Sequence, residues 1–328
     1  MIQLTNVYKS YQEQPALQGV SISVSEGQCA VLIGPSGCGK STLLKTINRM
    51  VDIDEGEVKV RGKAVQEYEP EELRRNTGYC IQGVGLFPHL SVSENIAMVP
   101  KLLKWPEDKI IPRVKLLMEL SGLPLSYLDK KPHQLSGGEA QRVGVCRALA
   151  ADPPILLMDE PFGSVDPLNR EKLQQAFIAL QKELRKTVLF VTHDVEEALM
   201  VGDLIFVMNQ GKVVAEGTPG QLAGSMESAF AKEFLGKEYP MKLLKRYTAR
   251  DLPMASLPKD SGDITGSETE DMPLSLKNPP LTENSNLQQV LSRMLEENRT
   301  TLPILREDDT VHYITYESLV AHLKEMSQ

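Results

Sequence analysis

Short apolar runs alternate with segments of helical periodicity along most of the chain. The runs at 28–33, 154–158 and 187–192 are mostly apolar and have the length of buried strands. Segments 40–50 and 173–184 instead have hydrophobic residues every three or four positions, which is typical of helices buried on one face. Because strands separated by helices of this length usually pair in parallel, we predict a parallel sheet with crossover helices.

The alternating pattern ends with a predicted hairpin, after which the composition changes. Residues 204–208 and 212–216 lie on either side of Gln210-Gly211, a dipeptide that favours a tight turn. Segment 252–283 has no hydrophobic period and is rich in Pro, Ser, Gly, Asp and Glu, as linkers are. We therefore predict an α/β domain over 1–240, followed by a connector and flexible linker over 241–281.

Hydrophobic periodicity returns over 282–328. Ser285 and Gln288 have the spacing of a helix-capping box, and runs 301–305 and 311–315 predict two strands before a second helix. The hydrophobic helix positions are Leu287, Val290, Leu291, Met294 and Leu295, then Leu319, Val320 and Leu323. About 45 residues are too few for an independent core, so we expect this small α+β unit to pack against the main domain or a copy of itself.

Charge distinguishes the C-terminal quarter from the rest of the 328 residues. The net charge is −8, and residues 251–328 contain 14 acidic and 6 basic residues. Residues 1–250 contain 30 of each, so the whole acidic excess lies in the C-terminal quarter. Since nucleic-acid phosphates are bound by Lys and Arg, this distribution argues against a nucleic-acid partner for the tail.

Composition narrows the class of protein further. The apolar fraction of 41% and charged fraction of 24% are ordinary for soluble domains. No uncharged apolar run approaches the ~20 residues of a membrane span, and the N-terminus lacks the pattern of a signal peptide. The cysteines form no C-x-x-C pair, which favours reduced thiols in the cytosol: Cys29, Cys38, Cys80 and Cys146.

Residues 34–41 match the phosphate-binding pattern G-x-x-x-x-G-K-[ST] between a predicted strand and a predicted helix. Glycines let backbone N–H groups converge on phosphate oxygens at the helix N-terminus. Lys40 supplies charge for the β- and γ-phosphates, and Ser41 offers a hydroxyl to Mg²⁺. A chance Gly-rich turn is the alternative, which the flanking elements disfavour. The predicted nucleotide-binding residues are Gly34, Pro35, Ser36, Gly37, Cys38, Gly39, Lys40, Ser41 and Thr42.

Three further candidates follow apolar strands. Asp159 and Glu160 end the run at 154–158, where open α/β sheets bind ligands. Asp159 suits the Mg²⁺ shell, and Glu160 suits a group that orients and polarises the attacking water. His193 follows the run at 187–192 and is a candidate for a γ-phosphate contact. An acidic helix cap and an ordinary capping or core histidine are the structural alternatives.

Segment 135–139, Leu-Ser-Gly-Gly-Glu, opens a predicted helix with Ser136 as the candidate N-cap. Gly137 and Gly138 leave backbone N–H groups exposed. An ordinary capped helix start is the alternative, and the residues alone do not say whose phosphate this segment would bind.

Together, these motifs resemble the ATPase subunits of ABC transporters. The P-loop, Gln82, Leu-Ser-Gly-Gly-Glu, the Asp159-Glu160 motif and His193 occur in that family's order and spacing over about 1–240. The resemblance implies an α/β P-loop NTPase with a parallel-sheet core, an antiparallel β subdomain and a helical subdomain. It also implies ATP and Mg²⁺ as ligands, with Lys40, Glu160 and His193 acting in ATP hydrolysis.

The same resemblance implies a homodimer that encloses two ATP molecules between its ATPase domains. Gln82 would contact Mg²⁺ and the attacking water, Tyr11 would stack on adenine, and Asp166 would belong to the D-loop. Residues of one subunit would contact the ATP bound to its partner: Ser136, Gly137 and Gly138.

Three further segments indicate which group of ABC transporters the chain resembles. Segments 78–105 and 232–252 are similar to ATPase subunits of importers for glycine betaine, carnitine, choline and related osmoprotectants, and 282–328 resembles a single CBS motif. The resemblance implies integral-membrane permease partners, indirectly a solute-binding protein, and a peripheral position on the cytoplasmic face of a bacterial membrane. The small size and acidic charge of the tail predict a regulatory or dimerising role for it, with a passive solubilising appendage as the alternative. The alternatives are an importer ATPase for another solute such as amino acids, a soluble ABC ATPase, or a regulatory module without turnover.

Overall fold

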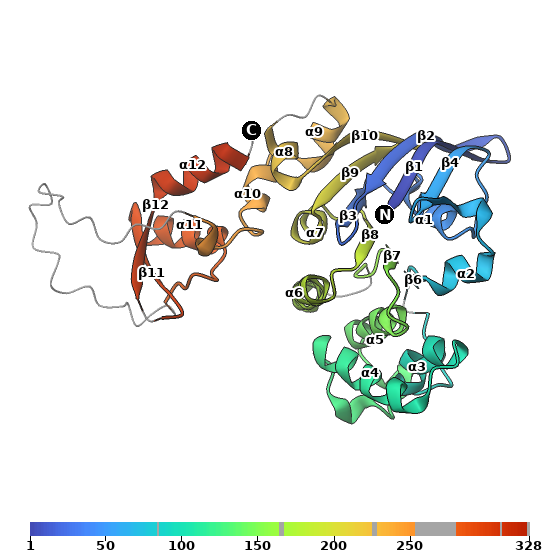
Figure 1. The fold of residues 1–328 in the computed structure, drawn as a ribbon. Helices are drawn as coiled ribbons and strands as arrows, with labels where there is room; N and C mark the ends of the chain where they lie inside the picture. Colours follow the sequence, from blue (N-terminus) through green and yellow to red (C-terminus); the bar gives the residue numbers. More distant parts are fainter. Residues whose placement is uncertain (84, 164–166, 225–227, 253–279, 309, 327–328) are drawn as a thin grey trace, which may run out of the picture. The chain divides into compact units, whose positions relative to one another are not determined.

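The computed structural model describes residues 1–83, 85–163, 167–224, 228–252, 280–308 and 310–326. The chain divides into two compact units (Figure 1). The first comprises Met1–Pro219 and Glu227–Phe234, and the second comprises Gly220–Met226 and Leu235–Gln328.

A six-stranded sheet forms the centre of the first unit, in the order β10-β9-β3-β8-β7-β6. Its neighbours pair in parallel except β10, which is antiparallel to β9. Every residue of β3, β7 and β8 is buried, which explains their unbroken apolar composition and confirms the predicted parallel sheet. The strands are β3 Cys29–Ile33, β6 Thr77–Cys80, β7 Ile155–Asp159, β8 Thr187–Thr192, β9 Leu204–Asn209 and β10 Lys212–Gly217.

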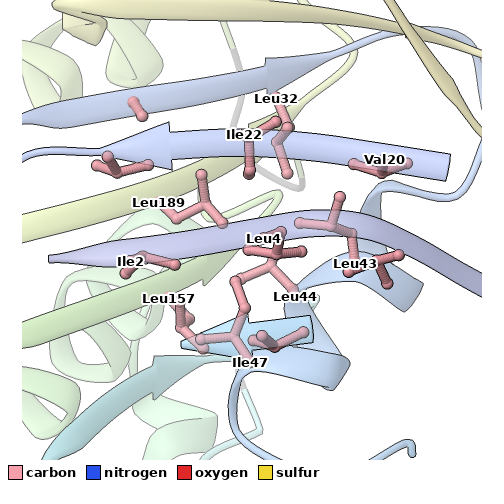
Figure 2. Packing of buried hydrophobic residues seen from close by; sticks show 14 of the residues in the cluster. Ile2, Leu4, Val20, Ile22, Leu32, Leu43, Leu44, Ile47, Leu157 and Leu189 are labelled. Carbon is pink, nitrogen blue, oxygen red and sulfur yellow. The ribbon is translucent and has the colours of Figure 1, made fainter. Parts of the chain in front are cut away.

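An antiparallel sheet packs beside the central one, in the order β2-β1-β4-β5. Side chains from β1 and β2 lie against those of helix α1 (Lys40–Ile47) and of the central strands (Figure 2). This shared core fixes the N-terminus of α1 at the end of β3. The strands are β1 Ile2–Tyr11, β2 Gln14–Val24, β4 Glu55–Val60 and β5 Lys63–Ala64.

Three helices form a separate cluster within the first unit (Figure 1): α3 Val92–Leu102, α4 Glu107–Leu120 and α5 Gly137–Leu149. This cluster is the predicted helical subdomain. Helix α8 Pro219–Gly224 belongs mostly to the second unit. The other described helices of the first unit are η1 Val65–Glu67, α2 Pro70–Arg75, η2 Leu125–Tyr127, η3 Pro132–Gln134, α6 Pro167–Leu184, α7 Val195–Val201 and nearly all of α9 Ala229–Leu235. Among the described residues, no helix combines the length and apolar character needed to cross a membrane.

The second unit has a hydrophobic core of its own, and part of it comes from the connector. Leu244, Ala249 and Leu252 are buried together with residues of the tail helices and strands. The helix faces expected to need an external partner are therefore partly covered from within the chain. The elements are α10 Tyr239–Leu243, η4 Ala249–Asp251, α11 Leu287–Glu296, β11 Thr301–Leu305, β12 Val311–Thr315 and α12 Tyr316–Met326.

Two local predictions for the tail are wrong. The cap of α11 is Asn286, whose side chain accepts from the Gln289 N–H at 2.9 Å, whereas Ser285 Oγ accepts from the Thr282 N–H. Leu295 is 72% exposed. The buried face of the helix consists of Leu287, Val290 and Met294, and Leu295, one position after Met294, is rotated away from that face.

Residues 281–283 lie within the segment that composition assigned to a linker, yet they are paired. Thr282 bridges to Leu305 in parallel, and the Glu283 N–H donates to the Leu305 carbonyl at 3.0 Å. The Glu283 carboxylate is buried and accepts hydrogen bonds from Arg250 at 3.3 Å and Arg306 at 3.2 Å. This ion cluster joins the connector to the strands. Residues 253–279 of the expected linker lie outside the described residues.

Candidate functional site

The P-loop connects β3 to α1, and its glycines permit two close backbone approaches. A Cβ on Gly34 would lie 2.2 Å from the Met208 carbonyl oxygen, and one on Gly39 would lie 2.4 Å from that of Ala16. Gly39 also has a φ of 107°, which L side chains rarely adopt. Larger residues would therefore push the loop away from strands β2 and β9.

Lys40 is buried at the first turn of α1, within the curve of the loop. Its Nζ donates to the carbonyl oxygens of Gly34 at 2.8 Å and Pro35 at 2.9 Å. These bonds hold the ammonium group at the predicted phosphate site. The arrangement can bind an anionic oxygen through the loop amides, the helix N-terminus and this cation together.

Ser41 and Asp159 place two oxygen groups beside the P-loop. Asp159 is buried at the end of β7, and its Oδ1 accepts from Ser41 Oγ at 2.8 Å. Burial raises the pKa of the Asp159 carboxyl, and the neighbouring Glu160 charge raises it further. A hydroxyl beside a poorly solvated carboxylate suits a hard cation such as Mg²⁺, so these residues would hold the ion brought by a nucleotide.

Two predicted residues, Gln82 and His193, contact the carboxylate of a third, Glu160. Gln82 Nε2 donates to Glu160 Oε2 at 3.2 Å, and His193 Nδ1 lies 3.4 Å from Glu160 Oε1. Gln82 follows β6, Glu160 follows β7 and His193 follows β8, so the parallel order brings the three strand ends together. The sheet thus assembles residues that are distant in sequence.

Glu160 has an unusual backbone conformation for an acidic residue. Its φ is 46°, in the left-handed region, and its N–H donates to the Val191 carbonyl at 3.0 Å. That bond from the adjacent β8 segment fixes the turn after β7. The strain resembles that stored where a side chain must be presented at a functional site.

Ser136 caps α5 through a complete capping box. Its Oγ accepts from the Glu139 N–H at 3.3 Å, and its own N–H donates to Glu139 Oε2 at 2.8 Å. The hydrogen bond from the Ser136 backbone lowers the pKa of the Glu139 carboxyl. Tyr127 donates to Glu139 Oε1 at 3.3 Å and supports the cap. Both residues beyond the cap, Gly137 and Gly138, begin the helix.

Of the two remaining candidates, Tyr11 and Asp166, the structure describes only the first. Tyr11, at the end of β1, is 46% exposed, and Lys9 Nζ lies 5.7 Å from its ring centroid. Asp166 lies outside the described residues.

The sequence patterns did not single out Arg147, near the end of α5, which donates to the Gly85 carbonyl at 2.8 Å. An arginine near the end of a largely buried helix gives no local signal of that contact.

A P-loop following a parallel strand, with a serine–aspartate pair and a strand-end glutamate, defines a P-loop nucleotide-binding protein. A family model described as ABC transporter matches residues 17–163. A curated relative, the osmoprotectant import ATP-binding protein OsmV of Salmonella typhimurium, is 38% identical over 351 residues, covering 94% of this chain and 92% of that protein. The chain belongs to the ABC transporter family.

A second relative aligns with a shorter part of this chain, at a higher sequence identity. The glycine betaine/carnitine/choline transport ATP-binding protein OpuCA of Bacillus subtilis is 46% identical over 239 residues, or 73% of this chain. The match spans 63% of that protein's length. These relatives confirm the resemblance to osmoprotectant ATP-binding subunits.

A solved structure agrees with the fold of the first unit. The ATP-binding cassette MJ0796, in a dimeric post-hydrolysis state bound to ADP and phosphate, has a TM-score of 0.61 and 33% identity. The match covers 66% of this chain and 98% of that one.

Proposed function

We propose that this chain is the ATP-binding and ATP-hydrolysing subunit of an importer for osmoprotectants of the quaternary-amine type. The supporting observation is the convergence of Gln82 and His193 on Glu160, beside the Ser41–Asp159 pair. Nucleotide binding alone would not require a strained, hydrogen-bonded carboxylate at this position. The solute class rests on relatives named for osmoprotectant, glycine betaine, carnitine and choline transport.

In the proposed reaction, the P-loop amides and Lys40 hold the ATP phosphates. A water oxygen bonds to the γ-phosphorus while the bond to the bridging oxygen breaks, which releases ADP and phosphate. Glu160 orients this water and takes the proton it loses, Gln82 donates a hydrogen bond to one oxygen of that carboxylate, and His193 contacts the γ-phosphate from the end of β8. Mg²⁺ held near Ser41 and Asp159 would neutralise charge on the phosphate oxygens.

The proposed partners follow from the same assignment. Two copies would pair, which the dimeric state of the MJ0796 cassette supports. By the family resemblance, Ser136, Gly137 and Gly138 of one copy would face the ATP of the other. Separate permease subunits would supply the membrane path, and a solute-binding protein would deliver the solute. The chain would lie peripherally on the cytoplasmic face of the membrane.

Uptake in cells tests the proposal directly. A strain lacking this protein should lose uptake of labelled glycine betaine, carnitine or choline at high osmolarity, and the wild-type gene should restore it. The Glu160→Gln variant should be present at wild-type abundance yet fail to restore uptake. Full uptake with that variant would contradict the ATPase role, whereas unchanged uptake in the deletion strain would redirect the assignment to another solute.

A further inference from the structure

Arg147 binds the loop that contains Gln82. It lies in the last turn of α5, where its Nη1 donates to the Gly85 carbonyl at 2.8 Å and its guanidinium carbon lies 5.9 Å from the Phe87 ring centroid. Burial lowers the pKa of this guanidinium, so the cation has given up water for these contacts. The interaction joins a helix of the helical cluster to a loop of the central sheet.

The described residues of this loop near Gln82 are bound to the rest of the chain at few points. It leaves the sheet after Cys80, the last residue of β6, and is fixed again at Phe87, whose N–H donates to Asn95 Oδ1 at 2.9 Å. Among the described residues between Cys80 and Phe87, the backbone group that accepts a hydrogen bond from a side chain is the Gly85 carbonyl, which Arg147 binds. Gly85 has a φ of 51°, in the left-handed region that favours glycine.

We propose that Arg147 is a positioning residue that sets Gln82 against Glu160 and the Mg²⁺-nucleotide. The inference rests on the proposed function, because it concerns how that site is assembled. Gln82 is three positions from the anchored carbonyl, and its amide reaches Glu160 at 3.2 Å. Without the anchor, the loop samples other conformations and Gln82 spends less time in this arrangement.

The anchor also links two functional elements through one helix. Ser136 caps the first turn of α5 and Arg147 lies in its last turn. A shift of the segment that faces the partner's nucleotide is therefore transmitted to the Gln82 loop of the same subunit. The two ends move together because α5 is a continuous, largely buried helix.

The test compares Arg147→Met with a matched control, Arg113→Met. Arg113 also donates to backbone carbonyls at the end of α5, those of Leu149 at 3.0 Å and Ala150 at 3.4 Å, and to Asp152 at 2.9 Å. It makes no hydrogen bond to the described residues of the Gln82 loop. Arg147→Lys keeps the charge and loses the planar fork, so its effect should be intermediate. Each variant is purified as the full chain, and its folding is checked by thermal unfolding.

Three measurements separate positioning from simple destabilisation. Affinity for Mn²⁺, used in place of Mg²⁺ and measured by its EPR signal with bound ADP, should fall about tenfold in Arg147→Met. Hydrogen exchange of amides in 81–87 should accelerate, and ADP binding in EDTA should stay within about twofold of wild type. Arg113→Met should lower thermal stability while leaving Mn²⁺ affinity and 81–87 exchange unchanged.

Equal Mn²⁺ affinity and equal exchange in Arg147→Met and wild type would overturn the inference. So would the same changes in Arg113→Met, because they would then reflect general loosening. Failure of the proposed function is distinguishable, since it would appear as wild-type protein without Mg²⁺-dependent ATP hydrolysis. The exchange measurement does not depend on turnover.

Discussion

Ser41 Oγ donates a 2.8 Å hydrogen bond to Asp159 Oδ1, although 118 positions separate the two residues. The contact exists because β3 and β7 end at the same edge of the sheet with only β8 between them. It places a hydroxyl and a carboxylate where the P-loop can present phosphates. The ionised form of Asp159 is destabilised in the folded protein, because the carboxylate is buried near the charge of Glu160.

Asp159→Asn should separate stability from metal binding. The pKa of Asp159 is raised in the folded state, so above that pKa the folded protein must hold a charge that the unfolded chain solvates better. At pH 7 without Mg²⁺ and nucleotide, the variant should therefore be at least as stable as wild type. With Mg²⁺ and ATP, it should lose most of the added stabilisation. Thermal unfolding under both conditions measures the difference.

Asp54→Asn is the matched control of opposite sign. Hydrogen bonds from Lys9 and the Ser10 N–H lower the pKa of Asp54, which lies in the exposed turn before β4. This substitution should reduce stability at pH 7, and the reduction should shrink as pH falls through the ordinary carboxyl range. The response to Mg²⁺ and ATP should be unchanged. A destabilised Asp159→Asn protein without ligands would contradict the first prediction.

Glu160→Gln should retain ATP binding and lose hydrolysis by about two to four orders of magnitude. The amide can still accept a hydrogen bond from Gln82, but it cannot take a proton or polarise water as a carboxylate does. The variant should accumulate as an ATP-bound dimer in size-exclusion chromatography. Hydrolysis at the wild-type rate would exclude the role assigned to Glu160.

Lys40→Ala should give the opposite pattern, with loss of ATP binding itself. It removes the ammonium group that donates to the Gly34 and Pro35 carbonyls at the phosphate site. Lys45→Ala, an exposed substitution on the same helix, is the control and should bind ATP normally. Equilibrium binding of a fluorescent ATP analogue distinguishes the two variants.

Ser136→Arg should abolish cooperative hydrolysis without weakening ATP binding to the monomer. Mixed with Lys40→Ala subunits, it should form heterodimers with one intact composite site, built from one subunit's P-loop and the other's Ser136. Those heterodimers should regain ATP trapping that neither homodimer shows. Ser91→Ala is the control for the lost helix cap, since Ser91 caps α3 through a similar box with Glu94. Absence of trapping in the mixture would refute the cross-dimer assignment.

The buried central strands β3, β7 and β8 and the P-loop were predictable because their signals are local, whereas β1, β2, β4, β5 and β6 were not predicted from the pattern. The run at 187–192 is buried along its whole length, and the P-loop needs glycines at fixed positions. The grouping of Gln82, Glu160 and His193 followed only from family resemblance, because sheet order is a long-range property. Arg147 and Glu283 were missed for the same reason: their partners are distant in sequence, and neither lies in a motif.

The tail should make dimerisation or ATPase activity responsive to ionic strength. Residues 251–328 contain 14 acidic and 6 basic residues, so two tails brought together in a dimer would repel one another. Salt shortens the reach of this repulsion from about 8 Å at physiological ionic strength to about 3 Å at 1 M. Higher ionic strength should therefore favour the paired state, as an osmoprotectant importer would require. A passive, solubilising appendage is the alternative.

The deletion that tests this must respect the core of the second unit. Removal of the tail from residue 281 would expose Leu244, Ala249 and Leu252, whereas removal of 236–328 takes them away with their partners. A triple variant, Glu296→Gln with Glu307→Gln and Glu317→Gln, lowers the charge through exposed positions and leaves the core intact. Dimerisation and ATPase activity are measured from about 0.05 M to about 1 M salt, over which the Debye length falls from above about 10 Å to about 3 Å. Both should rise with salt in the full chain, respond less in the triple variant and stay flat in the deletion. A deletion with the same salt profile as the full chain would leave the passive appendage.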